Sequence, residues 1–143
     1  MGAKVANYLV SVLAMHDARA AGAVEALVVD RNECVVEGAT SNVFAILGGC
    51  LVTPPEEAGI LLGITRARVL ESARELGMEP VLRPLPVAEL TGAQEVFISS
   101  SIRELMPVVR VDGVQIGSGA PGPVTGRLHQ TFRKKISKYN ALH

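Results

Sequence analysis

Four short stretches are more polar, or richer in glycine, than strands and helices alone require: residues 4–8, 37–42, 63–66 and 99–104. The first contains Lys4, whose neighbours on both sides are small or apolar. An amine in such surroundings loses part of its solvation and becomes a better nucleophile near neutral pH. The alternative is an ordinary solvated lysine near the beginning of the chain.

A carboxylate begins the second stretch. Glu37 follows the apolar run Cys34-Val35-Val36, so it must either reach solvent or face a positively charged partner. A plain edge residue remains the alternative.

Two further stretches are suited to anions. Gly63-Ile64-Thr65 leads into a predicted helix, where unpaired amide N–H groups, the Thr65 hydroxyl and the helix dipole can converge on a phosphate. The run Ser99-Ser100-Ser101 follows a predicted strand and offers hydroxyls and amides in a tight space. An ordinary helix start and a polar strand end are the simpler interpretations of these two stretches.

Taken together, the four stretches contain the groups that pyridoxal phosphate requires. These are an amine that forms an imine, a partner for the pyridinium nitrogen, and an anchor for the phosphate. The combination favours a cofactor site more strongly than any one stretch does alone.

The surrounding pattern predicts the elements that position these groups. Helical spacing predicts one helix capped by Asn7 and ended by Gly22, another from Thr65 to Gly77, and a final one with Val124, Leu128, Phe132 and Ile136 inward. Short β-branched runs predict antiparallel hairpins and strands at 26–30, 34–37, 42–47, 50–53, 81–82, 95–99 and 108–111, with a helical turn at 87–90. The order predicts an α+β fold, a barrel-like mixed sheet with flanking helices, formed as one domain over residues 1–143.

Composition excludes several classes of protein. The 143 residues carry 14 basic and 14 acidic side chains, so the chain lacks the positive surplus that drives nucleic-acid binding. A hydrophobic content of 48% and a mean hydropathy of +0.31 argue against disorder. The longest uncharged run, 38–55, is broken by glycines and prolines and is not a membrane helix.

Cysteine and histidine usage indicates a reducing compartment and no metal. Cys34 and Cys50 have no nearby ligand companions and follow no secretory leader, so we expect free, buried thiols and a cytoplasmic protein. The histidines are scattered, so no metal site is expected. Arg103 follows the serine run and is expected to pair with Glu104 or a neighbouring helix, or else to approach a substrate carboxylate.

Seven segments of the chain resemble the class IV aminotransferases, the fold type IV pyridoxal-phosphate enzymes. That family includes branched-chain aminotransferases, D-amino-acid aminotransferases and aminodeoxychorismate lyase. The segments, in order, are AKVANYLVSVLA, EALVVD, VVEGATSNVF, LVTPPEEAGILLGITR, ELG, EVFISSSIRELMPV and VDGVQIGSGAPGPVT. The pair EGATSNVF and GILLGITR is the most specific part of the resemblance.

The resemblance implies a role for most residues of the four stretches. Lys4 would hold pyridoxal 5′-phosphate as a Schiff base and move the proton at the substrate α-carbon, and Glu37 would pair with the pyridine nitrogen. Further cofactor contacts would come from Tyr8, Thr40, Leu61, Gly63, Ile64, Thr65 and Ser101. Of these, Ile64, Thr65 and Ser101 would hold the phosphate. Backbone amides of Ser100, Ser101 and Ile102 would face the substrate carboxylate.

The resemblance also implies a homodimeric transaminase that moves an amino group between an amino acid and a 2-oxo acid. Residues 1–143 would be its large, cofactor-binding domain, without the small N-terminal domain of the family. A branched-chain substrate is the first expectation and a D-amino acid the second. Two alternatives stay open: a lyase that releases pyruvate from aminodeoxychorismate, and a truncated module without stable cofactor binding.

Overall fold

The computed structural model describes the backbone of residues 2–142 and the side chains of residues 8–138. Its first element is helix α1 (Gly2–Ala20), which begins six residues earlier than an Asn7 cap would allow. The expected cap is therefore wrong, because the alanine-rich segment before Asn7 continues the helix. The predicted end is confirmed, since Gly22 adopts φ +82° just beyond the last turn.

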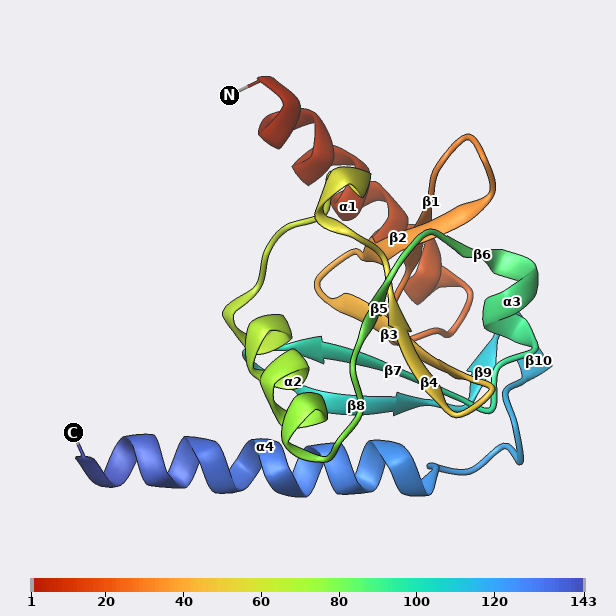
Figure 1. Ribbon diagram of the computed structural model, residues 1–143. Coiled ribbons are helices and arrows are strands. Elements are labelled where there is room, and N and C mark those ends of the chain that lie inside the picture. Colours follow the sequence, from red (N-terminus) through yellow and green to blue (C-terminus); the bar gives the residue numbers. More distant parts are fainter. Residues whose placement is uncertain (1, 143) are drawn as a thin grey trace.

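Across residues 2–142, ten strands form three sheets. Figure 1 shows how they are arranged. The largest has the order β5 (Val81–Leu82), β4 (Cys50–Thr53), β3 (Asn42–Leu47), β7 (Glu95–Ser100) and β8 (Glu104–Val108). Only β4 and β5 run parallel. The second sheet has the order β1 (Leu27–Val29), β2 (Cys34–Gly38) and β6 (Leu85–Pro86), and the third is the hairpin β9 (Arg110–Val111) with β10 (Val114–Gln115).

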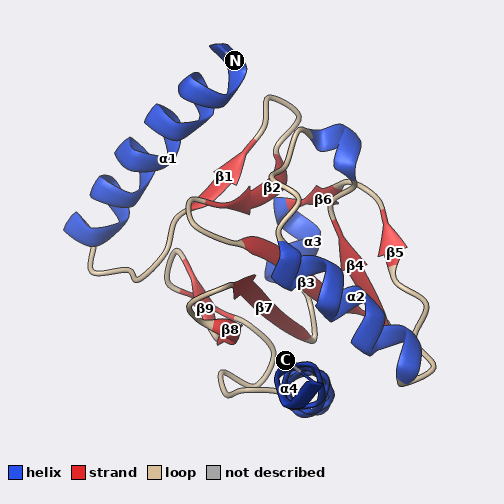
Figure 2. Ribbon diagram, turned by 90° about the vertical axis from the view of Figure 1, so that its left-hand side faces the viewer, coloured by secondary structure: helices blue, strands red, loops and turns tan. Residues whose placement is uncertain are grey.

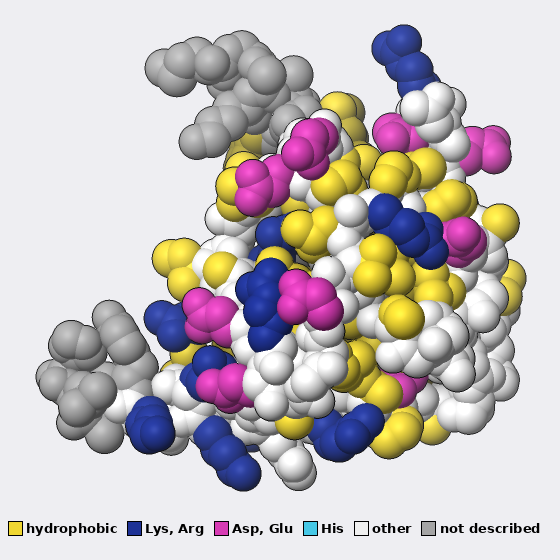
Figure 3. Space-filling model, in the orientation of Figure 1, with side chains coloured by type: hydrophobic (Ala, Val, Ile, Leu, Met, Phe, Trp, Pro, Cys, Tyr) yellow, Lys and Arg dark blue, Asp and Glu magenta, His cyan; other side chains and the backbone are white. Residues whose placement is uncertain are grey.

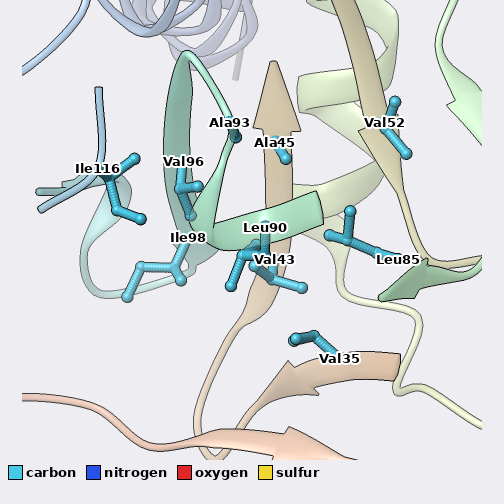
Figure 4. Close-up of a cluster of buried hydrophobic side chains, with 10 residues drawn as sticks. All are labelled: Val35, Val43, Ala45, Val52, Leu85, Leu90, Ala93, Val96, Ile98 and Ile116. Carbon is cyan, nitrogen blue, oxygen red and sulfur yellow. The ribbon is translucent and has the colours of Figure 1, made fainter. Parts of the chain in front are cut away.

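Strands β3 and β7 are buried on both faces, and their side chains point alternately into two separate cores. Val43 and Ala45 of β3 enter one core, and Phe44 and Ile46 enter the other. The first core also receives Val35, Leu85 and Leu90, which face Val43 from β2, β6 and helix α3 (Val87–Thr91) (Figure 4). Two buried faces explain why β3 is a nearly continuous apolar run.

The second core lies between the large sheet and helices α2 (Ile64–Glu75) and α4 (Pro123–Leu142). At its centre Phe44 and Phe97 stack with ring centroids 4.8 Å apart. The predicted inward face of the last helix is confirmed: Leu128 and Phe132 are buried, with Val124 and Ile136 packed against them. Figure 2 shows α4 almost end-on beside α2, with α1 at the upper left next to β1.

The outer face of α4 is basic, with one exception. Arg127, Arg133 and Lys134 are exposed, and positive side chains line this edge of the molecule in Figure 3. Lys135 differs, because its Nζ lies 2.8 Å from Glu75 Oε1. It therefore links α4 to α2.

Glu95 attaches the first turn of α4 to the sheet. It is a buried residue of β7 whose Oε2 accepts the Val124 N–H at 3.1 Å, while Oε1 accepts the N–H and hydroxyl of Thr125 at 2.9 Å each. The carboxylate thus satisfies amides that a helix start leaves unpaired.

The predicted α+β class with a mixed sheet and flanking helices is confirmed. Across residues 2–142 the strands stay in separate sheets and close no barrel. The expected strand at 108–111 is divided: β8 ends at Val108, and β9 begins at Arg110. Both thiols are free, but Cys50 is exposed and Cys34 only partly buried, so their expected burial is wrong. The short 3-10 turn η1 (Glu56–Ala58) completes the chain between β4 and α2.

Candidate cofactor site

Glu37 lies near the end of β2 with its side chain half-buried. Its Oε2 accepts a hydrogen bond from the Leu61 N–H at 3.1 Å. Burial raises the pKa of the Glu37 carboxyl, and the Leu61 N–H opposes this rise by stabilising the anion. No Lys, Arg or His among residues 8–138 forms an ion pair with Glu37. The site therefore holds a partly desolvated carboxylate that a cation would stabilise.

A cavity of about 90 Å³ lies beside Glu37. Its other lining residues are Val10, Ser11, Val28, Val36, Ala58 and Gly59. Ligand pockets usually measure about 300–1,000 Å³, so this cavity is too small to enclose a ligand, and its residues form a wall beside Glu37.

Asn42, the first residue of β3, connects this wall to the segment before α2. Its side-chain amide donates to the Leu61 carbonyl at 2.9 Å, so the Leu61 backbone is held by Asn42 through its C=O and by Glu37 through its N–H. A Cβ on Gly63 would lie 2.9 Å from Asn42 Oδ1, which makes glycine the residue that allows this approach. Asn42 belongs to the polar stretch 37–42, but the sequence assigned it no role of its own; its signal was a polar residue opening an otherwise apolar strand.

The N-terminus of α2 has no side-chain cap. Gly63 is the N-cap and provides no side-chain cap, and the Ala67 N–H makes the bond to the Gly63 carbonyl. The amides of Ile64, Thr65 and Arg66 precede that bond and have no acceptor within the helix. The Thr65 residue is only 9% exposed, and among residues 8–138 its hydroxyl has no hydrogen-bond partner.

The serine run ends β7 with Ser99 and Ser100 and begins the turn to β8 with Ser101. Ser99 pairs with Asn42 across the sheet, and its hydroxyl is buried without a partner within the described part of the chain. Ser100 Oγ accepts the Arg103 N–H at 3.0 Å, while Ser101 and Ile102 are exposed at the tip. The run is therefore a tight turn whose outer groups face away from the core.

These contacts bring three of the four polar stretches together. Glu37 bonds to Leu61, Leu61 bonds to Asn42, and Asn42 pairs with Ser99. Gly63 packs against the same Asn42 side chain. The carboxylate, the α2 N-terminus and the serine turn thus share one region of the molecule.

The remaining predicted residues are less directly connected. Tyr8 is 70% exposed on α1, Leu61 directs its side chain largely to solvent, and Thr40 is exposed and bonded to Glu25. Lys4 belongs to α1, but its side chain lies outside the described residues, so its distance from Glu37 stays a prediction.

Arg103 does not bind Glu104, contrary to one expectation from the sequence. Its NH1 lies 3.6 Å from Glu25 Oε2 and its NH2 donates to the Val24 carbonyl at 3.2 Å. Glu104 accepts instead from Arg133 and bonds His129, both on α4 and both at 2.9 Å. Neither Glu25 nor this use of His129 was identified from the sequence, because each contact joins distant segments.

The described residues contain no group of three or more His, Cys, Asp or Glu side chains arranged to hold a metal ion. No helix within these residues has the length and apolar character needed to cross a membrane.

Known proteins share both the sequence and the fold of this chain. A model of the family "Amino-transferase class IV" matches residues 1–111. The branched-chain-amino-acid aminotransferase of Escherichia coli (strain K12) is 43% identical over 126 residues, which is 88% of this chain and 41% of that protein. The D-alanine aminotransferase of Bacillus licheniformis is 38% identical over 133 residues, covering 93% of this chain and 47% of that protein.

A solved structure supports the same relationship. The branched-chain aminotransferase of Thermobaculum terrenum in its pyridoxal-phosphate form superposes with a TM-score of 0.86 at 37% identity, covering 92% of this chain and 43% of the other. The chain spans somewhat less than half the length of the curated relatives it matches. With a family model matched over most of its length, this chain belongs to the class IV aminotransferases.

Proposed function

We propose that this chain forms the cofactor-binding part of a pyridoxal 5′-phosphate-dependent transaminase. One observation carries the proposal: the Glu37 carboxylate, the open amides of α2 and the serine turn are joined through Leu61 and Asn42. This arrangement offers an acid for a ring nitrogen and donors for a phosphate on one wall. The solved relative in its pyridoxal-phosphate form supports the choice of cofactor.

The residues divide the work of binding between the two ends of the cofactor. The Glu37 carboxylate would accept a hydrogen bond from the protonated pyridine nitrogen, and that cation would compensate the desolvation that raises its pKa. The amides of Ile64 and Thr65, with the hydroxyls of Thr65 and Ser101, would hold the phosphate. Gly63 would keep the approach to these amides open.

When bound, the cofactor supplies an electron-withdrawing ring that stabilises negative charge on the α-carbon of an amino acid. Lys4 Nζ would then take the proton from that carbon and return it to the neighbouring cofactor carbon. Glu37 would keep the proton on the pyridine nitrogen throughout. The amides of Ser100, Ser101 and Ile102 would orient the substrate carboxylate.

We propose a branched-chain amino acid as the amino donor and a 2-oxo acid as the acceptor. The 43% identity to a branched-chain enzyme over 126 residues supports this choice over a D-amino acid, for which the D-alanine enzyme gives 38%.

In the experiment, the protein with pyridoxal 5′-phosphate is mixed with one amino donor at a time. Chromatography then follows the conversion of pyridoxal phosphate to pyridoxamine phosphate. We expect conversion with L-leucine that exceeds conversion with D-alanine and is lost in Lys4→Ala. Faster conversion with D-alanine would overturn the substrate assignment. Equal conversion by the wild type and Lys4→Ala would overturn the transaminase itself, and pyruvate release from aminodeoxychorismate would indicate a lyase.

We also propose that the protein is a cytoplasmic homodimer. Large apolar side chains are exposed on α1 and near the site, among them Leu13 at 64%, Ile64 at 77% and Ile102 at 93%. Such surfaces favour association, and two free thiols are typical of a reducing compartment. Light scattering and cell fractionation test these two points, and a monomer or an extracytoplasmic protein would contradict them.

A further inference from the structure

A charged contact joins two polar segments, of which the proposed function places the second in the cofactor site. The first is the β2–β3 loop with Thr40 and Ser41, and the second is the serine turn that ends at Arg103. Between them lies Glu25, from the segment that connects α1 to β1. Its side chain is only 7% exposed.

The Glu25 carboxylate accepts hydrogen bonds mainly from the β2–β3 loop. Its Oε2 accepts from the Thr40 hydroxyl at 2.7 Å, from the Ser41 hydroxyl at 2.9 Å and from the Thr40 N–H at 3.2 Å, while Oε1 accepts the Ala26 N–H at 2.9 Å. Four donors on one nearly buried carboxylate fix its position tightly, because charged acceptors form the stronger hydrogen bonds.

Backbone geometry makes room for this arrangement at Gly38. A Cβ built there would collide with the Ser41 hydroxyl and would lie 3.0 Å from Glu25 Oε2. The loop is also held by the Ala39 N–H, which donates to the Ala26 carbonyl at 2.8 Å. The absence of a side chain at Gly38 therefore allows the carboxylate to reach the loop.

The serine turn supplies the positive charge opposite this carboxylate. Arg103 NH1 lies 3.6 Å from Glu25 Oε2 and has no other partner in the described part of the chain, although the atom is buried. Arg103 is fixed on its own side as well, since its N–H donates to Ser100 Oγ at 3.0 Å. The guanidinium thus extends from the turn to the residue that holds the opposite loop.

We propose that the Glu25–Arg103 ion pair is a positioning device that holds the Thr40–Ser41 loop and the Ser100–Arg103 turn at a fixed separation. Neither residue touches the reacting atoms in this account. They act through Thr40 and Ser101, so the consequence for cofactor binding rests on the proposed function. The separation of the two segments itself does not depend on it.

The test uses amide NMR on the chain without cofactor. Arg103→Gln removes the charge from one segment, and we expect it to shift the Thr40 and Ser41 amides in the other and to accelerate exchange of the Thr40 N–H about tenfold. Glu25→Gln should shift the Ser100–Ile102 amides in return. Arg103→Lys should restore most of the wild-type Thr40 signal, since it keeps the charge.

Glu79→Gln and Arg74→Gln provide the matched control, because Arg74 and Glu79 form an exposed ion pair at 3.4 Å. These two variants should leave the amide signals of Thr40, Ser41 and Ser100–Ile102 unchanged. Wild-type Thr40 and Ser41 signals in folded Arg103→Gln would overturn the proposal. If Arg103→Gln unfolds, Arg103→Lys decides between the two outcomes. A wild-type spectrum of Arg103→Lys would support a charge contact, and Thr40 signals displaced as far as in Glu25→Gln would contradict it.

A second measurement separates this inference from the proposed function. Titration with pyridoxal 5′-phosphate should give a dissociation constant about 5- to 10-fold higher for Glu25→Gln than for the wild type or Glu79→Gln. Equal constants would remove the link to the cofactor. Failure of the wild type to react at Lys4 would overturn the proposed function, while the amide shifts would still decide whether the ion pair positions the two segments.

Discussion

The backbone N–H of Leu61 donates to Glu37 Oε2 at 3.1 Å, which ties the loop before α2 to the acidic end of β2. On its other side, the Leu61 carbonyl accepts from Asn42 at 2.9 Å. One peptide segment thereby sets the position of the carboxylate relative to the phosphate-suited amides of α2.

Asn42→Ala removes the donor that holds the Leu61 carbonyl. We expect the Leu61 N–H to bond Glu37 less well, so the pKa of Glu37 should rise further, because burial then acts with less opposition. The lost buried hydrogen bond should also lower the free energy of unfolding by about 1–2 kcal/mol. NMR titration of the Glu37 carboxyl and urea unfolding measure the two effects, and an unchanged titration would contradict this role of Asn42.

Glu37→Gln should be at least as stable as the wild type at neutral pH. Because burial raises the pKa of Glu37, the folded protein holds more protons than the unfolded chain between the ordinary and the raised pKa. The contribution of Glu37 to stability is therefore present below its ordinary pKa and is lost as the pH rises through the raised one. The gain in the variant should stay below about 1 kcal/mol, since solvent screens a half-buried group.

Urea unfolding of both proteins over this pH range measures the difference between their free energies of unfolding. We expect the advantage of Glu37→Gln over the wild type to grow as the pH rises. A variant that loses stability relative to the wild type as the pH rises would reverse the sign and show that Glu37 has a favourable charged partner.

Glu95→Ala should weaken the attachment of α4. Three donors, the Val124 N–H and the N–H and hydroxyl of Thr125, lose a buried acceptor. Unsatisfied buried groups are costly, and we expect a loss of about 3 kcal/mol in the free energy of unfolding. Circular dichroism during urea unfolding measures it, with the exposed Glu79→Ala as a control that should change stability by about 0.5 kcal/mol or less. A loss no greater than in the control would exclude a capping role.

Glu104→Gln should remove an acid-sensitive contact between β8 and α4. Bonds from His129 and then Arg133 lower the pKa of Glu104, so its contribution to stability is present above the ordinary glutamate pKa and is lost as the pH falls through the lowered one. The wild type should therefore lose its advantage over the variant on acidification. Partial exposure limits that advantage to below about 1 kcal/mol. A difference in the free energy of unfolding between the wild type and Glu104→Gln that does not change with pH would show that the contact contributes nothing.

Local pattern was sufficient to predict most elements of the fold. The apolar run of β3, the inward face of α4, and the ends of α1 and α2 at Gly22 and Gly77 follow from neighbouring residues, and both glycines adopt positive φ. Strand β8 was missed because Pro107 interrupts its pattern. Pro107 is tolerated there because β8 is an edge strand, where the missing N–H of proline breaks no hydrogen bond inside the sheet.

Contacts between distant segments could not be predicted in this way. Arg103 binds the Val24 carbonyl 79 residues away, whereas its sequence neighbour Glu104 binds α4. The polar stretches were identified because their residue types were unusual for their setting. Asn42 and Glu25, which connect them, become recognisable only when β3 pairs with β7 and the α1–β1 segment meets the β2–β3 loop.

Reduction with borohydride in the presence of pyridoxal 5′-phosphate, followed by peptide mass mapping, tests the central claim most directly. The chain has four lysines, of which Lys134, Lys135 and Lys138 lie on α4 and serve as internal controls. Selective modification of Lys4 at low cofactor concentration, reduced in Glu37→Gln, is the expected result. Equal modification of all four lysines, unaffected by Glu37→Gln, would contradict the assignment of this region as a cofactor site.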